Sequence, residues 1–379
     1  MQPVRRLLKR AEGVLQRELI RAVSLPARLR GATGDLRRPR RVLVLRHDWI
    51  GDMILSTGCL RRIKAAHPQA DVDVVAGPAN AAVLDGLPFV RRVFVHRQGD
   101  VLGVVRLRRE LRAVGYDAAL NGRVLRPKLT PDIALVLIAS GAPRRIGVVG
   151  GGADFVYTDP VAPPADGHFV RHLAALTEPL GLDPEAGDWR PVLHVRASER
   201  EVAERQWSAV PGTGRRLLVN ISARTRPRRW PDERFVATLR RLRAAAPDVR
   251  ILVISPPDEF ESARRIAGAV GATAARPLLR EMFALVAGAE MVFTPDTSIA
   301  HVASAFVTPI VVMFVPGWSG FVPYRTPGRY ICASGATLET LPVEPVAAAL
   351  ELVHAAGHSL EPECLPFSPT APHVGVASP

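Results

Sequence analysis

Three short segments of the sequence concentrate the side chains that could bind an anion or move a proton. The first, RHDWIGD, begins at Arg46 and ends in Gly51 and Asp52. A carboxylate placed between a strand and a helix can act as a general base on a substrate hydroxyl. Asp is also favoured at helix N-caps, so capping of a helix expected over residues 53–66 is the other interpretation of Asp52.

The second segment is a basic loop between a predicted strand and a predicted helix. It runs SARTRPRRWP from Ser222 to Pro231 and contains Arg224, Thr225 and Arg228. Cationic side chains at the carboxyl end of a strand are well placed to bind phosphate. A solvated surface loop is the alternative, and Trp230 weakens it because a large apolar ring normally needs a packing partner.

The third segment, TPDTSIAH, also follows an apolar strand and leads into a helix. Its polar residues are Asp296, Thr297, Ser298 and His301. The backbone N–H groups of a first helical turn form a ready anion site. An N-cap and a structural histidine would explain the same residues, but their clustering after a strand favours a binding function.

Two further carboxylate positions lead to different expectations. Glu259 follows a predicted strand at the same sheet edge, where it could accept hydrogen bonds from a ribose diol or simply cap a helix. The Asp71-Val72-Asp73 motif has the spacing of a metal site, but it begins a strand and belongs to the opposite edge. We therefore predict no metal and no cofactor.

Short apolar strands alternate with helical segments, which is typical of a parallel sheet covered on both faces. Two such series are present, which predicts two Rossmann-like domains with ligands at the carboxyl ends of the strands. Strands are expected over residues 42–45, 72–76, 90–95, 116–121, 144–149, 217–222, 250–255, 291–294 and 309–314. Helices are expected over residues 53–66, 169–180, 231–246 and 258–269, and from Ser298.

The predicted domain limits follow changes in composition along the chain. A basic, amphipathic extension covers residues 1–40, the first domain residues 41–188, the second residues 189–358, and a disordered tail rich in Pro, Ser and His residues 359–379. The extension has apolar residues at near-helical spacing among Arg and Lys, as in helices that lie on anionic membranes. A packed or disordered arm is the alternative.

Composition restricts the class of protein. The net charge of +14 is carried almost entirely by arginine in an Ala-, Pro- and Gly-rich chain, and no basic stripe with interleaved aromatic residues suggests nucleic-acid binding. Three scattered cysteines do not form a disulfide framework. No apolar stretch approaches the roughly 18 residues of a membrane span, and the first residues lack the features of a secretory signal. We expect a cytoplasmic protein.

Together, the three segments resemble glycosyltransferase family 9, the ADP-heptose:lipopolysaccharide heptosyltransferases. FTPDTSIAHVASAF resembles the family's Asp-Thr-Gly-x-x-His signature, although Ser298 replaces the glycine. The resemblance implies a GT-B fold with two domains facing across a cleft, and an inverting reaction without metal. It further implies Asp52 as base, Arg228, in place of the usual lysine, facing the donor phosphates, and a donor site that includes Asp296 and His301.

The implied partners are ADP-heptose as donor and a lipopolysaccharide core or similar glycolipid as acceptor, with peripheral contact to the inner membrane. A different nucleotide-sugar, or a protein or glycan acceptor, is an alternative within the same fold. A nicotinamide-dependent oxidoreductase is disfavoured because HDWIGD replaces the glycine fingerprint after the first strand. A non-catalytic basic protein that binds membrane or nucleic acid is the alternative of another class.

Overall fold

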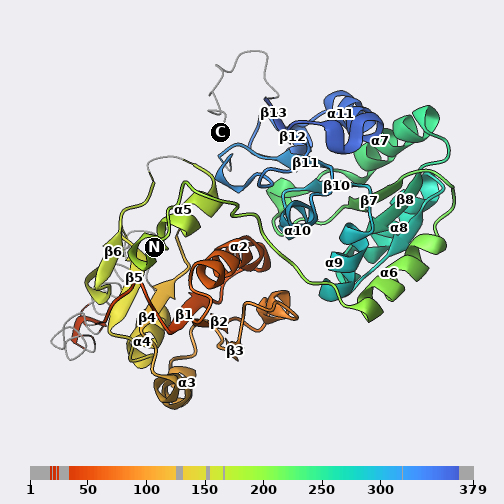
Figure 1. Ribbon diagram of the computed structural model, residues 1–379. Coiled ribbons are helices and arrows are strands. Elements are labelled where there is room, and N and C mark those ends of the chain that lie inside the picture. The colour runs from red at the N-terminus through yellow and green to blue at the C-terminus, as the bar shows by residue number, and fades with distance from the viewer. Residues whose placement is uncertain are drawn as a thin grey trace, which may run out of the picture. The chain divides into compact units, whose positions relative to one another are not determined.

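The computed structural model describes residues 18, 20–22, 24, 34–124, 131–150, 154–164, 167–317 and 319–366. The chain divides into two compact units, residues 1–194 and 195–379. Each unit contains one parallel sheet with helices packed on its faces (Figure 1). This is the pair of Rossmann-like domains that the sequence predicts.

The first unit has a six-stranded sheet in the order β3-β2-β1-β4-β5-β6. All of its neighbouring strands pair in parallel. The strands are β1 Arg41–Arg46, β2 Asp71–Ala76, β3 Arg92–Val95, β4 Ala118–Asn121, β5 Arg144–Val148 and β6 Asp159–Val161. The helices are α2 Ile50–Ala66, α3 Val101–Val114, α4 Pro131–Ala139 and α5 Phe169–Ala175.

Strand β1 lies inside this sheet and is buried on both faces. Leu43 and Leu45 pack in the core cluster that includes α3 and α4. Because side chains alternate along a strand, the buried Val42 and Val44 point to the opposite face. This two-sided burial explains why the strand is a continuous apolar run, and it places the end of β1 and the loop after it at the carboxyl edge of the sheet.

The second unit has a seven-stranded parallel sheet in the order β13-β12-β11-β10-β7-β8-β9. Its strands are β7 Arg216–Asn220, β8 Arg250–Ile254, β9 Thr273–Ala275, β10 Met291–Pro295, β11 Ile310–Phe314, β12 Gly328–Cys332 and β13 Glu363–Pro366. Its helices are α6 Ala197–Ser208, α7 Asp232–Ala245, α8 Phe260–Ala269, α9 Leu279–Ala287, α10 Ser298–Phe306 and α11 Val343–Ala356.

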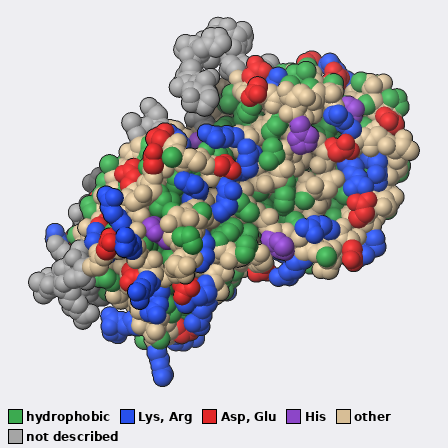
Figure 2. All heavy atoms as spheres, viewed as in Figure 1, with side chains coloured by type: hydrophobic (Ala, Val, Ile, Leu, Met, Phe, Trp, Pro, Cys, Tyr) green, Lys and Arg blue, Asp and Glu red, His purple; other side chains and the backbone are tan. Residues whose placement is uncertain are grey.

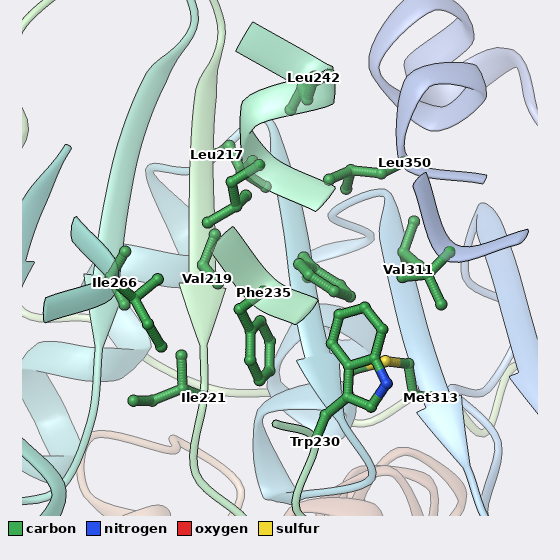
Figure 3. Close-up of a cluster of buried hydrophobic side chains, with 14 of the residues drawn as sticks. Leu217, Val219, Ile221, Trp230, Phe235, Leu242, Ile266, Val311, Met313 and Leu350 are labelled. Atoms are coloured by element: carbon green, nitrogen blue, oxygen red, sulfur yellow. The ribbon is translucent and has the colours of Figure 1, made fainter. Parts of the chain in front are cut away.

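Trp230 is the packing partner of the basic loop in this unit. Its ring contacts Phe235 and Phe293 edge-on, with centroids 5.1 and 6.1 Å apart. Its Nε1 donates a hydrogen bond of 2.9 Å to the carbonyl of Leu341. Figure 3 shows the indole inside the apolar cluster between β7, β10, β11 and the helices above them. Trp230 thus anchors the basic loop to the core, as the sequence suggests it should.

The second unit contains a helix and a strand that the sequence analysis does not predict. Helix α6 is absent from the predicted helices, and its charged sequence buries only Ala203 and Trp207. Strand β13 lies in the predicted disordered tail, where it pairs in parallel with β12 as the edge strand of the sheet. The tail prediction was therefore wrong for residues 363–366, and residues 367–379 lie outside the described part.

The observed boundary falls between His194 and Val195 rather than between residues 188 and 189. Contacts with α2 hold the preceding segment in the first unit. Thr57 Oγ1 accepts a 2.7 Å hydrogen bond from the backbone N–H of Val192, and Trp189 is fully buried. A methyl group at Gly58 would come within 2.2 Å of the Trp189 carbonyl oxygen, so only glycine allows this close approach.

Most of the predicted N-terminal extension lies outside the described residues. Ile20, one of its apolar residues, is 3% exposed and belongs to the core cluster of the first unit. Arg21 stacks over the ring of Phe155 at 5.5 Å. The described part of the extension therefore packs against the first unit. Across the described residues, no helix combines the length and apolar character needed to cross a bilayer.

Candidate active site

Asp52 lies in the first turn of α2, at the carboxyl edge of the first sheet. The helix begins at Ile50 with Trp49 as its N-cap, so Asp52 is the third helical residue and not the cap itself. Its carboxylate accepts a hydrogen bond from the backbone of Trp49. That bond satisfies a donor at the helix start, so Asp52 contributes to the local fold in addition to any chemical role.

Arg46, the last residue of β1, fixes the carboxylates of this loop. It is 2% exposed; its Nε lies 3.2 Å from Asp48 Oδ1 and its Nη2 lies 3.3 Å from Asp52 Oδ1. Its Nη1 donates to the carbonyl of Gly122, and its guanidinium stacks 4.9 Å from the ring centroid of Phe169. These contacts hold Asp52 in one position relative to the sheet.

Burial raises the pKa of the Asp52 carboxyl above its ordinary value of 3.8. The positive charges of Arg46 and Arg123 oppose this rise, and the negative charge of Asp48 adds to it. A carboxylate with a raised pKa is a stronger base than an exposed aspartate. The site therefore favours proton acceptance.

A second layer of contacts supports this loop from neighbouring strands. His47 Nε2 lies 3.3 Å from Asp132 Oδ2, and both side chains are buried. The same carboxylate accepts a 3.1 Å hydrogen bond from the backbone N–H of Gly99. Asn80 Nδ2 donates to the carbonyls of Arg46 and Asp48. The loop after β1 is thereby tied to the loops after β2 and β3 and to the start of α4.

In the second unit, Asn220 at the end of β7 links the ends of two adjacent strands. Its Nδ2 donates to Thr294 Oγ1 at 2.9 Å and to the carbonyl of Ser222 at 3.0 Å. Its Oδ1 accepts from the Ser222 hydroxyl at 2.7 Å. Thr294 Oγ1 lies 3.2 Å from Thr297 Oγ1. These bonds bring two of the predicted segments together at the carboxyl edge of the second sheet.

Arg228 and Asp296 form the central ion pair of this edge. Arg228 Nη1 lies 3.1 Å from Asp296 Oδ2, and both side chains are largely buried. Burial raises the pKa of Asp296 from 3.8 to about 6, against the opposing effect of the Arg228 charge. A guanidinium has five N–H donors, so one guanidinium can engage a carboxylate and a further anion together.

Helix α10 begins next to this ion pair. Thr297 is its N-cap, and the Thr297 Oγ1 accepts a 3.3 Å hydrogen bond from the backbone N–H of Ile299. The N–H groups of a first turn have no partner within the helix, and with the helix dipole they favour an anion. Ser298 is the first helical residue, and His301 is buried in the second half of the first turn.

The rest of the basic loop forms a short 3₁₀ turn, Arg226–Arg228, which starts after Thr225. Arg229, not Arg228, pairs with Glu259. Burial raises the pKa of the Glu259 carboxyl, and the Arg229 charge opposes that rise. Arg224 is exposed. The structure thus brings Ser222, Thr225, Arg228, Asp296 and Thr297 to one edge, and ties Glu259 to the same loop.

The Asp71-x-Asp73 pair has a structural partner. Asp73 is fully buried and binds Arg91 Nε at 2.9 Å and the Tyr116 hydroxyl at 2.7 Å, while Asp71 binds Arg91 Nη1 at 2.6 Å. Both carboxylates neutralise one arginine at the amino end of the first sheet. This agrees with the expectation that the pair lies away from the strand ends where ligands bind.

Two residues that contact the site were not assigned a role from the sequence, namely Arg46 and Asn220. Each is a polar residue at the last position of its strand, directly after a run of buried apolar residues. Such a residue is costly to bury unless it is paired. A polar final residue after a buried run is therefore the signal that could have identified both.

The pKa of Asp296 predicts a specific pH dependence of stability. The Asp296 carboxyl keeps its proton up to about pH 6 in the folded state but releases it near pH 3.8 in the unfolded state. Protonation of Asp296 therefore stabilises the folded state, and this stabilisation is complete below about pH 4. The contribution is lost as pH rises from about 4 to about 6, and amounts to about 3 kcal/mol at most. Asp296→Asn removes this loss, so thermal unfolding should show the stability of the variant rising relative to that of the wild type between about pH 4 and about pH 6.

A constant difference in stability between Asp296→Asn and the wild type across this range would show that this carboxyl does not titrate as its burial requires.

The sequence and the fold of this chain have relatives among known proteins. Lipopolysaccharide heptosyltransferase 2 of Salmonella typhimurium is 24% identical over 307 residues, which are 75% of this chain and 85% of that protein. A glycosyltransferase family 9 structure from Veillonella parvula matches with a TM-score of 0.74 at 18% identity, covering 86% of this chain and 100% of that one. The E. coli heptosyltransferase WaaC with ADP matches with a TM-score of 0.66 at 20% identity, covering 84% and 100%.

Two Rossmann-like domains with these structural neighbours define the GT-B fold. The family model for glycosyltransferase family 9 (heptosyltransferase) matches residues 104–338, and the chain belongs to this family. The matched region contains the basic loop and the Asp296–His301 segment. It does not contain Asp52, so the role of that residue is argued from its own surroundings.

Proposed function

We propose that the chain transfers a heptose from ADP-heptose to a lipopolysaccharide core or similar glycolipid. The observation that carries the proposal is the Arg228–Asp296 ion pair beside the N-terminus of α10, in a member of the heptosyltransferase family. The related E. coli enzyme has been solved with ADP and with ADP-2-deoxy-2-fluoro heptose. Both ligands carry the diphosphate that such an anion site suits.

In this proposal the second unit binds the donor. Arg228 and the backbone N–H groups of Thr297 and Ser298 stabilise the charge that grows on the diphosphate as the sugar leaves. His301 is a further donor, and Glu259 accepts hydrogen bonds from the ribose diol. Ser222, Arg224 and Thr225 complete the surrounding loop. Ser298 keeps the backbone N–H of the glycine that it replaces.

The first unit supplies the base. Asp52 removes the proton from the acceptor hydroxyl as that oxygen attacks the anomeric carbon, and the ADP leaves from the opposite side. This single displacement inverts the configuration at the anomeric carbon. Gly51 precedes the base in the same turn. We also place the enzyme in the cytoplasm, at the face of the inner membrane that presents a glycolipid acceptor.

A donor comparison tests this assignment. ADP-heptose should raise the melting temperature more than UDP- or GDP-sugars, and mass spectrometry should find the acceptor heavier by one heptose residue. Transfer of another sugar from another nucleotide would favour the alternative of a different donor within the same fold. Stabilisation by every polyanion, without any product, would favour a non-catalytic basic protein and contradict the proposal.

A further inference from the structure

Exposed apolar side chains gather on one helix of the first unit. Seven large apolar residues of the described chain are markedly exposed, and three of them are on α3. Leu102 is 76% exposed, Val105 68% and Val101 50%. Residues three and four apart are neighbours on a helix surface, so these three side chains share one face. We call Val101, Leu102 and Val105 the α3 apolar face.

Arginines continue this face toward the end of the helix. Arg106, Arg108 and Arg109 are exposed and follow Leu102 and Val105 at spacings of three and four residues. The opposite side of α3 is the one that packs on the sheet, through Val104, Leu107 and Leu111. The acidic residue of this region of the helix, Glu110, pairs with Arg92 at 3.1 Å. The solvent side of α3 is therefore apolar in its first turns and cationic after them.

We propose that this side of α3 docks on an anionic phospholipid surface. An apolar turn that enters the boundary of the acyl chains, next to arginines at the level of the phosphate groups, is the chemistry that recognises such a surface. The charge on α3 complements phospholipid head groups. Figure 2 likewise shows Lys and Arg side chains gathered over the region where Figure 1 places α3.

The position of α3 links the docking to the proposed reaction. The helix follows the loop after β3, and that loop is tied to the Asp52 loop. The rings of His96 and His47 are 5.7 Å apart, and Asp132 binds both Gly99 and His47. Docking through α3 would hold the Asp52 loop close to a lipid-borne acceptor. This link to the reaction rests on the proposed function, whereas the docking itself does not.

Vesicle co-sedimentation of the full chain tests the docking. Vesicles of phosphatidylethanolamine with phosphatidylglycerol should bind the protein, and phosphatidylcholine vesicles should bind it much more weakly. Leu102→Ser with Val105→Ser should weaken binding by about tenfold or more, because two apolar side chains no longer enter the lipid. Arg106→Gln with Arg109→Gln should weaken binding by about tenfold or more at low salt, with a smaller loss at high salt.

Leu278→Ser is the matched control, since Leu278 is 72% exposed in the other unit, and it should bind like the wild type. If the double variant Leu102→Ser with Val105→Ser bound vesicles as strongly as the wild type, the proposal would be overturned. This outcome includes the case in which residues 1–33 carry the binding. Absence of vesicle binding, with a dimer that this double variant abolishes, would assign the face to a second copy and also overturn it.

Transfer to a water-soluble, deacylated acceptor separates this inference from the proposed function. The apolar double variant should keep wild-type transfer to that acceptor and lose transfer to the acceptor in vesicles. Failure of the wild type on every acceptor would refute the proposed function and leave the vesicle result standing.

Discussion

Asp52→Asn is expected to bind ADP-heptose like the wild type and to lose transfer by a factor of about 10²–10⁴. The amide keeps the size of the side chain but cannot take a proton from the acceptor hydroxyl. Because the proposed donor site belongs to the other unit, donor affinity should be preserved. Calorimetric titration of donor binding, together with the single-turnover rate of transfer, checks both parts.

Asp48→Asn is the matched control for this variant. Asp48 shares the Arg46 guanidinium with Asp52 and carries the same charge, so its loss perturbs the local field in a similar way. It should cost far less in rate than Asp52→Asn. If both variants lost the same amount, the effect would lie in the loop structure and not in a base; normal turnover by Asp52→Asn would remove the assignment.

Arg228→Ala should reduce kcat by about 10²–10³ and weaken donor binding as well. The variant removes a cation proposed to stabilise the leaving diphosphate, and it leaves the buried Asp296 without its ion-pair partner. The kcat and donor affinity of Arg228→Lys should lie between those of the wild type and of Arg228→Ala. Lysine keeps the charge but lacks the planar guanidinium that can engage Asp296 and a phosphate together. Steady-state kinetics with ADP-heptose measures these effects.

Arg226→Gln controls for the general positive charge of the loop. Arg226 is exposed in the same 3₁₀ turn, and its replacement should change kcat and KM only slightly. If Arg226→Gln were as damaging as Arg228→Ala, the loop would act through its overall charge rather than through one oriented guanidinium.

The fold was predictable where burial leaves a strong pattern. Strands such as β1 and β10 are buried on both faces, so they read as continuous apolar runs followed by a loop and a helix. Strands β6 and β9 have three residues each, too few for a pattern to stand out. Helix α6 buries only two residues, so its periodicity is weak. Strand β13 exists only because β12 offers it an edge to pair with.

The candidate sites were also only partly predictable from the sequence. The candidate residues could be chosen from the sequence because strand-end loops of a parallel sheet meet at one edge. Their partners could not be chosen, since pairing depends on side-chain direction. Arg228 and Arg229 are adjacent in the sequence, so the sequence could not show which of them pairs with Glu259. In the structure Arg229 binds Glu259 and Arg228 binds Asp296. The role of Arg46 in fixing Asp52 also became visible only in three dimensions.

A crystal structure with bound ADP tests the central claim most directly. We predict that the diphosphate lies at the start of α10, about 3 Å from the backbone N–H groups of Thr297 or Ser298 and from the Arg228 guanidinium. A diphosphate bound elsewhere, with the Arg228–Asp296 pair and the start of α10 untouched, would contradict the account.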